Sequence, residues 1–431
     1  MKFLYGPDEK PPFSVSLPAG MQWAVISVAY ILSFAMLIEN IQGGNGAVTV
    51  AFIQKVLLIT AAALVLQIFA GHRLPLVFGP SAALLIGISS STGFTEGVIY
   101  GSMAVAAAAG VLIASTGLLA YISRLFTYRV ITVVLLLISF TLILVITPMF
   151  ISSGGGSGSL YTLTFGLAVL AVMYLAQRFG GRIIRATLFL WVLIPGTLIY
   201  SLIFAYNPAE ITHYGLSGIA TGFPTGLTVE PGVLISFLIC YLAVIVNDIG
   251  SIRSIAEVIE ERSMQGRYKR GIIATGIANI ASGLFGVIGG VNYSISAGMI
   301  LETRCASKWT LVPAAIIMAA IAFLPDLVAL MTLVPSVIIG AVLIYVLAAQ
   351  FSAALYVFFK ETTGREFEYE SGIIVGLPVI IGTMISFIPS ETAEAFPPVI
   401  RPIIANGFVM GVIGVMLLEH VIFRKKKEPV S

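Results

Sequence analysis

The sequence predicts an all-α integral membrane protein with about fourteen transmembrane segments. Hydrophobic residues make up 58% of the 431 residues and charged residues only 10%, whereas soluble domains carry about 25% charged residues. Apolar runs long enough to cross a bilayer follow one another along nearly the whole chain. A chain with so few charges cannot cover a soluble globule with polar surface, so most of its surface must face lipid.

Each predicted span corresponds to one apolar run, because a helix needs about 20 apolar residues to cross the hydrocarbon. The runs are 21–39, 47–70, 75–91, 97–120, 129–150, 160–177, 183–205, 232–258, 271–285, 288–303, 310–332, 335–358, 371–389 and 403–423. Two of them, 75–91 and 288–303, are shorter and contain Gly or Pro. If these two segments are re-entrant, about twelve or thirteen spans remain.

The distribution of Lys and Arg predicts which loops face the cytoplasm. The chain ends with a basic stretch, 424–427, and an even number of spans places both termini on that side. Loops on the same side carry Arg73; Arg124 and Arg129; Arg178, Arg182 and Arg185; Arg262, Arg267, Lys269 and Arg270; Arg304 and Lys308; and Lys360 and Arg365. The opposite loops have almost no basic residues, so we expect a multi-pass protein of the plasma (inner) membrane with cytoplasmic termini.

The two halves of the chain resemble each other. Each has a short, Gly-containing third segment, around 75–81 in the first half and 285–294 in the second. Seven spans separate these segments, and an odd number of spans means that the halves run in opposite directions. Paired, broken segments in two inverted halves are typical of a transporter binding site, because irregular backbone at membrane depth must be buried or line a cavity.

The remaining polar residues do not predict an enzyme. The two cysteines, Cys240 and Cys305, allow one disulfide at most, and we expect none. The three histidines, His72, His213 and His420, lack the spacing of metal ligands, so we expect neither a metal nor a cofactor. No catalytic constellation is apparent within the apolar runs, and only the basic tail could suggest nucleic-acid binding.

Several motifs occur in the order and spacing of one family. The N-terminal stretch 5–12 (YGPDEKPP) and the stretch 270–286 (RGIIATGIANIASGLFG) are two of them. A third is the signature Asn-x-Gly-x-x-x-x-Thr-Arg, which 296–304 fits with Ser in place of Asn. Its signature residues are Ser296, Gly298, Thr303 and Arg304. The chain resembles the nucleobase–ascorbate transporter family, also called nucleobase:cation symporter-2, which includes uracil and xanthine permeases.

The resemblance implies two inverted repeats of seven segments, with a core domain and a gate domain. The implied division is a cytoplasmic N-terminus (1–20), core domain (21–120 and 232–332), gate domain (121–206 and 333–423), extracellular loop (207–231) and cytoplasmic tail (424–431). It also implies that the third and tenth segments each begin as a short strand, that these strands cross, and that a homodimer can form through the gate domains.

The resemblance places the substrate where the ends of these half-helices meet the eighth span. The implied substrate-binding residues are Asn247, Tyr30, Ala82, Tyr293, Ser294 and Ile295. Ser251 joins them because it lies one helical turn from Asn247 and shares its face. Two of them depart from the family: Asn247 stands where a glutamate usually binds the base, and Ile295 where an acidic or amide residue precedes the signature. Asp248 is the nearest carboxylate and therefore the candidate for proton or cation coupling. Its alternative role is to pair with Arg253 or a hydroxyl.

The function implied is secondary transport of a nucleobase such as uracil or xanthine, coupled to H⁺ or Na⁺ and working by an elevator-like movement. Two alternatives remain. One is an anion transporter of the sulfate-permease type, which has the same architecture. The other is a diverged transporter or uniporter of another small solute, because both family carboxylates are replaced.

Overall fold

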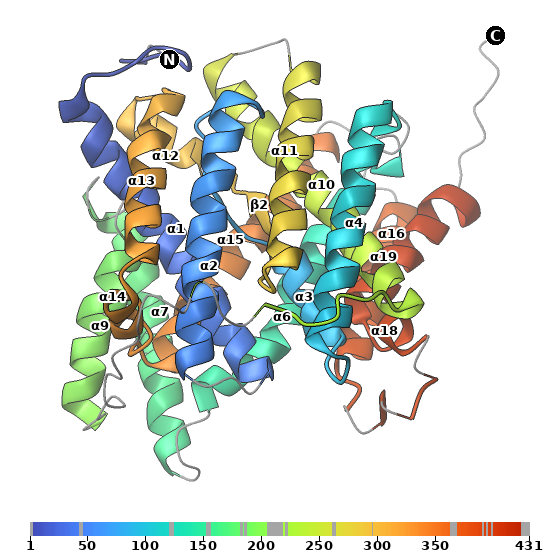
Figure 1. Ribbon diagram of the computed structural model, residues 1–431. Helices are drawn as coiled ribbons and strands as arrows, with labels where there is room; N and C mark the ends of the chain where they lie inside the picture. The colour runs from blue at the N-terminus through green and yellow to red at the C-terminus, as the bar shows by residue number, and fades with distance from the viewer. Residues whose placement is uncertain are drawn as a thin grey trace.

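A computed structural model of the chain is predominantly helical (Figure 1). It describes residues 3–42, 46–119, 125–151, 157–181, 184, 188–204, 219, 223–260, 264–294, 296–362, 369–389, 392–393, 395–397 and 400–423. Within these residues eight helices are long and apolar enough to cross a membrane, and a bent pair raises the number to nine. The fourteen segments stay a prediction.

The elements of the second half repeat the order of the first. The first half contains α1 (Phe13–Gln42), α2 (Gly46–Phe69), β1 (Phe78–Pro80), α3 (Ala82–Ser90), α4 (Glu96–Thr116), α6 (Tyr128–Ile151), α7 (Ser157–Phe179) and α9 (Leu188–Phe204). The second half contains α10 (Pro231–Ile259), α11 (Gln265–Leu284), β2 (Gly290–Asn292), α12 (Ser296–Thr303), η2 (Lys308–Thr310), α13 (Leu311–Ala322), α14 (Pro325–Met331), α15 (Ser336–Thr362), α16 (Tyr369–Ser386), α18 (Arg401–Ile404), α19 (Gly407–Leu417) and the π-helical turn η3 (Leu418–Ile422). In both halves the third place is taken by a short strand followed by a short helix.

Among the boundaries that differ from the sequence prediction, three change the architecture. Helix α1 begins at Phe13 rather than near Met21, so part of the expected N-terminal tail is helical. The run 310–332 is bent by 96° between α13 and α14, where Pro325 begins a new helix and cannot donate a hydrogen bond to the preceding one. The run 403–423 is interrupted at Asn406, whose side chain caps α19 by accepting from the amide of Val409.

The two strands form an antiparallel ladder of three residue pairs, as expected for the third and tenth segments. Phe78 lies opposite Asn292, Gly79 opposite Val291 and Pro80 opposite Gly290. The helices that follow, α3 and α12, are about 12–14 Å long at 1.5 Å per residue. Each is less than half the thickness of the hydrocarbon, about 30 Å, so each strand must share its segment with a half-helix.

The helices form two packed sets. One set contains α1, α2, α3, α4, α10, α11 and α13, which pack on one another and around the strands. The other contains α6, α7, α9, α15, α16, α18 and α19. The sets touch through α1 with α9 and α15, α3 with α6, and α10 with α18 and α19. The strand pair lies inside the first set (Figure 1).

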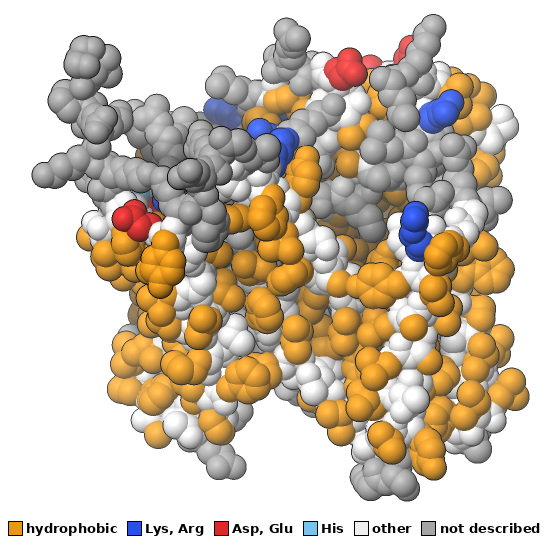
Figure 2. Space-filling view, turned by 180° about the vertical axis from the view of Figure 1, so that it is seen from behind, with side chains coloured by type: hydrophobic (Ala, Val, Ile, Leu, Met, Phe, Trp, Pro, Cys, Tyr) orange, Lys and Arg blue, Asp and Glu red, His pale blue; other side chains and the backbone are white. Residues whose placement is uncertain are grey.

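The surface is suited to lipid. Figure 2 shows apolar side chains over most of the visible face, with the visible Lys, Arg, Asp and Glu side chains confined to its upper part. Helix α9 is an example, since Leu198, Leu202 and Ile203 are 61%, 86% and 63% exposed. Large apolar side chains exposed in this way would be costly in water, so the helices are built to face the bilayer.

Candidate functional site

The candidate site is centred on the strand pair, where two half-helices begin. Helix α3 starts directly after β1, and Ser81 caps it by accepting from the amide of Leu84 at 3.4 Å. Helix α12 starts shortly after β2. Helix N-termini carry unpaired amides and a partial positive charge, which favour a ligand with negative or acceptor groups. The antiparallel strands bring both N-termini to the same depth.

Two side chains of helix α10, one turn apart, form hydrogen bonds with the backbone of β2. The hydroxyl of Ser251 donates to the carbonyl of Asn292 at 2.7 Å, and Asp248 Oδ1 accepts from the backbone amide of Asn292 at 2.9 Å. The other oxygen, Asp248 Oδ2, has no hydrogen-bond partner among the described residues. Asp248 is completely buried, so the predicted coupling carboxylate lies behind the strand rather than in an open cavity.

The side chain of Asn292 extends this contact into a polar network. Its Nδ2 donates to Asp248 Oδ1 at 2.9 Å and to Thr275 Oγ1 at 3.2 Å, which leaves Oδ1 as the acceptor. His72 Nε2 lies 3.2 Å from that Oδ1, and His72 Nδ1 accepts from the amide of Leu74. The hydrogen bonds therefore specify the neutral imidazole with its proton on Nε2. Hydrogen bonds thus connect four side chains and the Leu74 amide, which come from α10, α11, β2 and the stretch between α2 and β1.

A second pair of hydrogen bonds, from Asn279 of α11, holds the other end of β2. Asn279 Oδ1 accepts from the amide of Gly290 at 2.6 Å, and its Nδ2 donates to the carbonyl of Gly290 at 2.9 Å. Gln67 Nε2 donates to Thr275 Oγ1 and to the carbonyl of Gly271, both at 3.0 Å. Asn279 of α11 thus satisfies the buried backbone of Gly290, while Gln67 of α2 holds α11 in place through Thr275 and Gly271.

Tyr293 and Tyr30 close the opposite side of the strand pair. Tyr293 Oη donates to the carbonyl of Pro80 at 2.6 Å, and its ring lies 4.5 Å from that of Tyr30. Only Gly fits at position 79, because a Cβ there would lie 2.8 Å from Tyr293 Cε2. Tyr30 also meets Phe189 of α9 edge-to-face at 5.5 Å, so this aromatic contact joins the two packed sets of helices.

The structure brings most of the predicted binding residues to one place. Asn247, Ala82 and Tyr293 are half-buried, which leaves them partly accessible. Asn247 lies one turn before Ser251 on α10, and its amide makes no hydrogen bond to any described residue. Ser294 is exposed. Ile295 lies outside the described residues.

The signature residues have mainly structural contacts. Ser296 Oγ accepts from the amide of Val77 at 3.0 Å and donates to the carbonyl of Tyr293 at 2.7 Å, which ties α12 to β1. Gly298 and Thr303 lie on α12, and the side chain of Thr303 is outside the described part. Arg304 ends this helix with a positive φ of 56° and is exposed.

Sequence reasoning missed the residues that hold the strands. Asn292, His72, Thr275 and Asn279 were not predicted as site residues, although each is a polar side chain within or beside an apolar run. Such residues are expensive in a membrane and therefore functional candidates by default. That signal was present, but their partners lie far apart in the sequence: His72 and Asn292 are separated by 220 positions.

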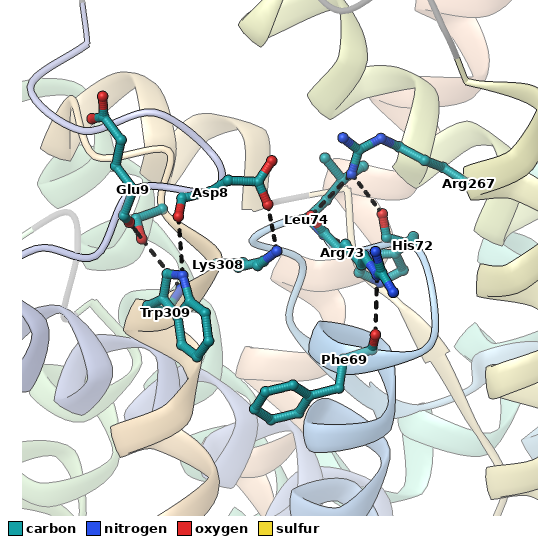
Figure 3. A network of polar contacts seen from close by, with 10 residues as sticks. Asp8, Glu9, Phe69, His72, Arg73, Leu74, Arg267, Lys308 and Trp309 are labelled. Carbon is teal, nitrogen blue, oxygen red and sulfur yellow. Dashed lines mark hydrogen bonds and ion pairs between the residues drawn. The ribbon is translucent and has the colours of Figure 1, made fainter.

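The N-terminal segment is docked beside the end of α12. Leu4 N donates to the carbonyl of Arg304 at 2.9 Å, Ala306 N donates to that of Tyr5 at 3.0 Å, and Lys308 pairs with Asp8. Figure 3 shows this pair beside the backbone of 72–73, to which Arg267 donates at 2.9 and 3.1 Å. We call residues 3–12 the strap.

The strap contains Asp8, whose carboxyl group has a lowered pKa. The hydrogen bond from Lys308, together with the charges of Lys308, Arg267 and Arg73, holds the pKa of Asp8 below its usual value. This group is mostly exposed, so its ion pair is screened by water and contributes little stability, about 0–1 kcal/mol.

Comparison with known proteins gives consistent matches. Residues 15–391 match the profile of the Permease family Xan_ur_permease. The uric acid permease PucK of Bacillus subtilis (strain 168) is 26% identical over 336 residues, which cover 75% of this chain and 77% of PucK. The nucleobase transporter PlUacP of Paenibacillus larvae subsp. larvae is 25% identical over 375 residues, which cover 84% of this chain and 83% of PlUacP.

A solved structure has the same architecture. The transmembrane domain of a cyanobacterium bicarbonate transporter, BicA, superposes with a TM-score of 0.61 over 86% of this chain and 95% of that domain. The sequence identity is 13%. At this identity the likeness shows the fold alone, which is that of a multi-pass helical membrane domain.

Proposed function

The chain belongs to the Xan_ur_permease family, and from that membership we propose that it is a secondary transporter of a nucleobase of the uracil or xanthine type. The observation that carries the proposal is the strand pair, with two half-helix N-termini beside the unpartnered amide of Asn247. A nucleobase is flat and carries several ring N–H and carbonyl groups. Backbone amides at the helix ends and a side-chain amide can bind such groups in one plane.

The proposed movement is an elevator-like shift of one packed set of helices against the other. The first set, with the strands, is the core domain, and the second set is the gate domain. The proposal includes the inverted seven-segment repeats, the cytoplasmic termini and a homodimer through the gate domains. Support comes from the repeated order of elements and from the short list of contacts between the sets.

Asp248 is the proposed coupling residue. It is a buried carboxylate within an apolar helix, and its Oδ2 has no hydrogen-bond partner among the described residues. A free carboxylate oxygen can take up a proton or bind Na⁺, and its partner Asn292 lies on the substrate strand. Binding a cation at Asp248 would therefore change the hydrogen bonds that position β2.

Asp248→Asn tests the coupling. The variant keeps the shape and one acceptor oxygen but cannot titrate. We expect uptake that no longer depends on the proton or Na⁺ gradient, with folded yield retained; Ser254→Ala on the same helix is the control. Uptake by Asp248→Asn that still follows either gradient would remove Asp248 from the coupling.

The alternative is a diverged transporter or uniporter of another small solute or anion, because Asn247 replaces the family's glutamate. Thermal stabilisation of the purified protein separates the two. A ligand that binds the folded state raises its apparent stability. We expect uracil, xanthine, hypoxanthine or guanine to raise the midpoint, whereas a shift with sulfate or bicarbonate alone would favour the anion transporter.

A further inference from the structure

A polar cavity of about 180 Å³ lies beside the candidate site. It is bounded by α3, α6, α16 and the stretch from α18 to the start of α19. Helix α18 lies toward the end of the molecule opposite the N-terminus (Figure 1), so the cavity is on the far side from the strap. Its polar lining residues are Ser89, Ser90, Thr92, Thr141, Ser386, Arg401 and Asn406.

The cavity and the strand site lie along the same face of helix α3. Ala82, Ile86 and Ser90 are spaced four apart on α3 and so share one face of that helix. Ile86 and Ser90 line the cavity, and Ala82 lies one turn deeper, next to β1. A solute in the cavity would therefore be about one helical turn, roughly 5 Å, from the candidate substrate site.

Arg401 is the charged group of this cavity. It is half-buried, and its guanidinium lies 5.0 Å from the ring of Phe94. Residues 390–391 and 394 lie outside the part of the chain that the structure describes. Within the described part, Arg401 pairs with no carboxylate. A planar guanidinium fixed on an aromatic face presents its N–H groups in a fork that matches an anionic or carbonyl oxygen.

The other lining groups offer acceptors. The hydroxyls of Ser90, Thr141 and Ser386 donate to carbonyls of their own helices at 3.1, 2.7 and 2.9 Å, so their oxygens retain lone pairs. Asn406 is held rigidly, because its Nδ2 donates to Ser90 Oγ at 2.8 Å and to Ser236 Oγ at 3.1 Å. The cavity thus combines one cationic donor with several hydroxyl acceptors.

We propose that this cavity is an outer recognition site for anionic oxopurines, in which Arg401 binds the charged oxygen edge and the hydroxyls accept from ring N–H groups. The proposal rests on the proposed nucleobase transport and assigns to it a substrate class and a specificity residue. An anion gains a charge-assisted hydrogen bond here, whereas a neutral base gains only ordinary ones. No described carboxylate lines the cavity to repel the anion.

The test compares an anionic with a neutral purine. Uptake of urate, an anion at neutral pH, and of hypoxanthine, which is neutral, is measured in proteoliposomes for wild type, Arg401→Gln and Arg401→Lys. The matched control is Arg178→Gln, another arginine that lies over a phenylalanine ring, 5.8 Å from Phe179, but outside the cavity. Folded yield is followed by size-exclusion chromatography.

We expect Arg401→Gln to raise the half-saturating concentration of urate about tenfold, since a hydrogen bond to a charged group contributes about 1.5–3 kcal/mol. Hypoxanthine should change by less than about twofold, Arg401→Lys should lie between, and Arg178→Gln should match wild type. Equal changes for both purines, or none, would overturn the proposal. If wild type transports neither purine, the proposed transport fails, and the cavity is then judged by binding: urate must stabilise wild type more than Arg401→Gln.

Discussion

Two asparagines near the strand pair have opposite environments. Asn292 is completely buried and makes hydrogen bonds to Asp248, Thr275 and His72, whereas Asn247 is half-buried with its amide unpartnered among the described residues. A buried polar group that loses its partner is costly, while an accessible one can exchange its partner for water or ligand. Asn292 therefore stabilises the fold, whereas the amide of Asn247 is available to bind the proposed substrate.

Replacement of Asn292 should destabilise the protein. Asn292→Ala removes a donor from the buried Asp248 carboxylate and the acceptor of His72. We expect the free energy of unfolding to fall by about 1–3 kcal/mol, seen as a lower thermal midpoint in detergent. Asn247→Ala is the matched control and should unfold within about 0.5 kcal/mol of wild type. Equal midpoints for the two variants would contradict the network described here.

Replacement of Asn247 should instead weaken substrate binding. Asn247→Ala removes the side-chain amide proposed to bind the base while leaving the packing of α10 unchanged. We expect at least about a fivefold loss of nucleobase affinity, as for one net hydrogen bond of about 1 kcal/mol, at unchanged folded yield. Isothermal titration with the best-bound base measures it, and unaltered affinity would remove Asn247 from the site.

At the scale of elements, the strap connects the N-terminus to the end of half-helix α12. Asp8 has a lowered pKa because Lys308 donates a hydrogen bond to it. A lowered pKa in the folded state means that the stabilisation is present above the usual Asp pKa of about 3.9 and is lost as the pH falls through the lower folded value. At neutral pH the contact is therefore fully formed.

Asp8→Asn should loosen the strap at neutral pH. We expect faster hydrogen exchange of the amides of Ala306 and Lys308, which donate to the strap, but a change in overall stability below about 1 kcal/mol, because the Asp8 carboxylate of the ion pair is largely exposed to water. In wild type, these two amides should exchange this fast only at acid pH, where Asp8 is protonated. Glu9→Gln is the control, since the Glu9 side chain accepts only from the nearby Gly6 amide, and the substitution leaves the Glu9 carbonyl that accepts from Ser307 in place. Slow exchange in Asp8→Asn at neutral pH would contradict this role.

The sequence allowed the broken third and tenth segments to be predicted, because Gly and Pro interrupt the apolar runs at 75–81 and 285–294. The bend before Pro325 was missed, since the apolar run continues across it. The main partner of Asp248 was also missed: the sequence suggested Arg253 or a hydroxyl, and the structure places Asn292 against the carboxylate, beside the Thr275 hydroxyl. Several Gly and Pro residues close together thus predicted a break, whereas an isolated Pro within a long apolar run did not. Contacts between distant segments depend on how the whole chain packs.

At the scale of the molecule, the contact between Tyr30 on α1 and Phe189 on α9 crosses from one packed set of helices to the other. If the sets shift during transport, this contact must separate. Tyr30→Cys with Phe189→Cys, in a chain whose Cys240 and Cys305 are replaced by Ala, should lose uptake when a short bifunctional reagent links the pair. Uptake should return when a cleavable link is broken; full uptake in the linked protein would contradict the shift.

The measurement that tests the central claim most directly is uptake of radiolabelled uracil, xanthine and hypoxanthine by the purified protein in liposomes, beside its Asn247→Ala variant. The account predicts saturable uptake of at least one of these bases by wild type and reduced uptake by the variant at equal protein content. Absence of saturable uptake for every base, or equal uptake by wild type and Asn247→Ala, would contradict a nucleobase site at the strand pair.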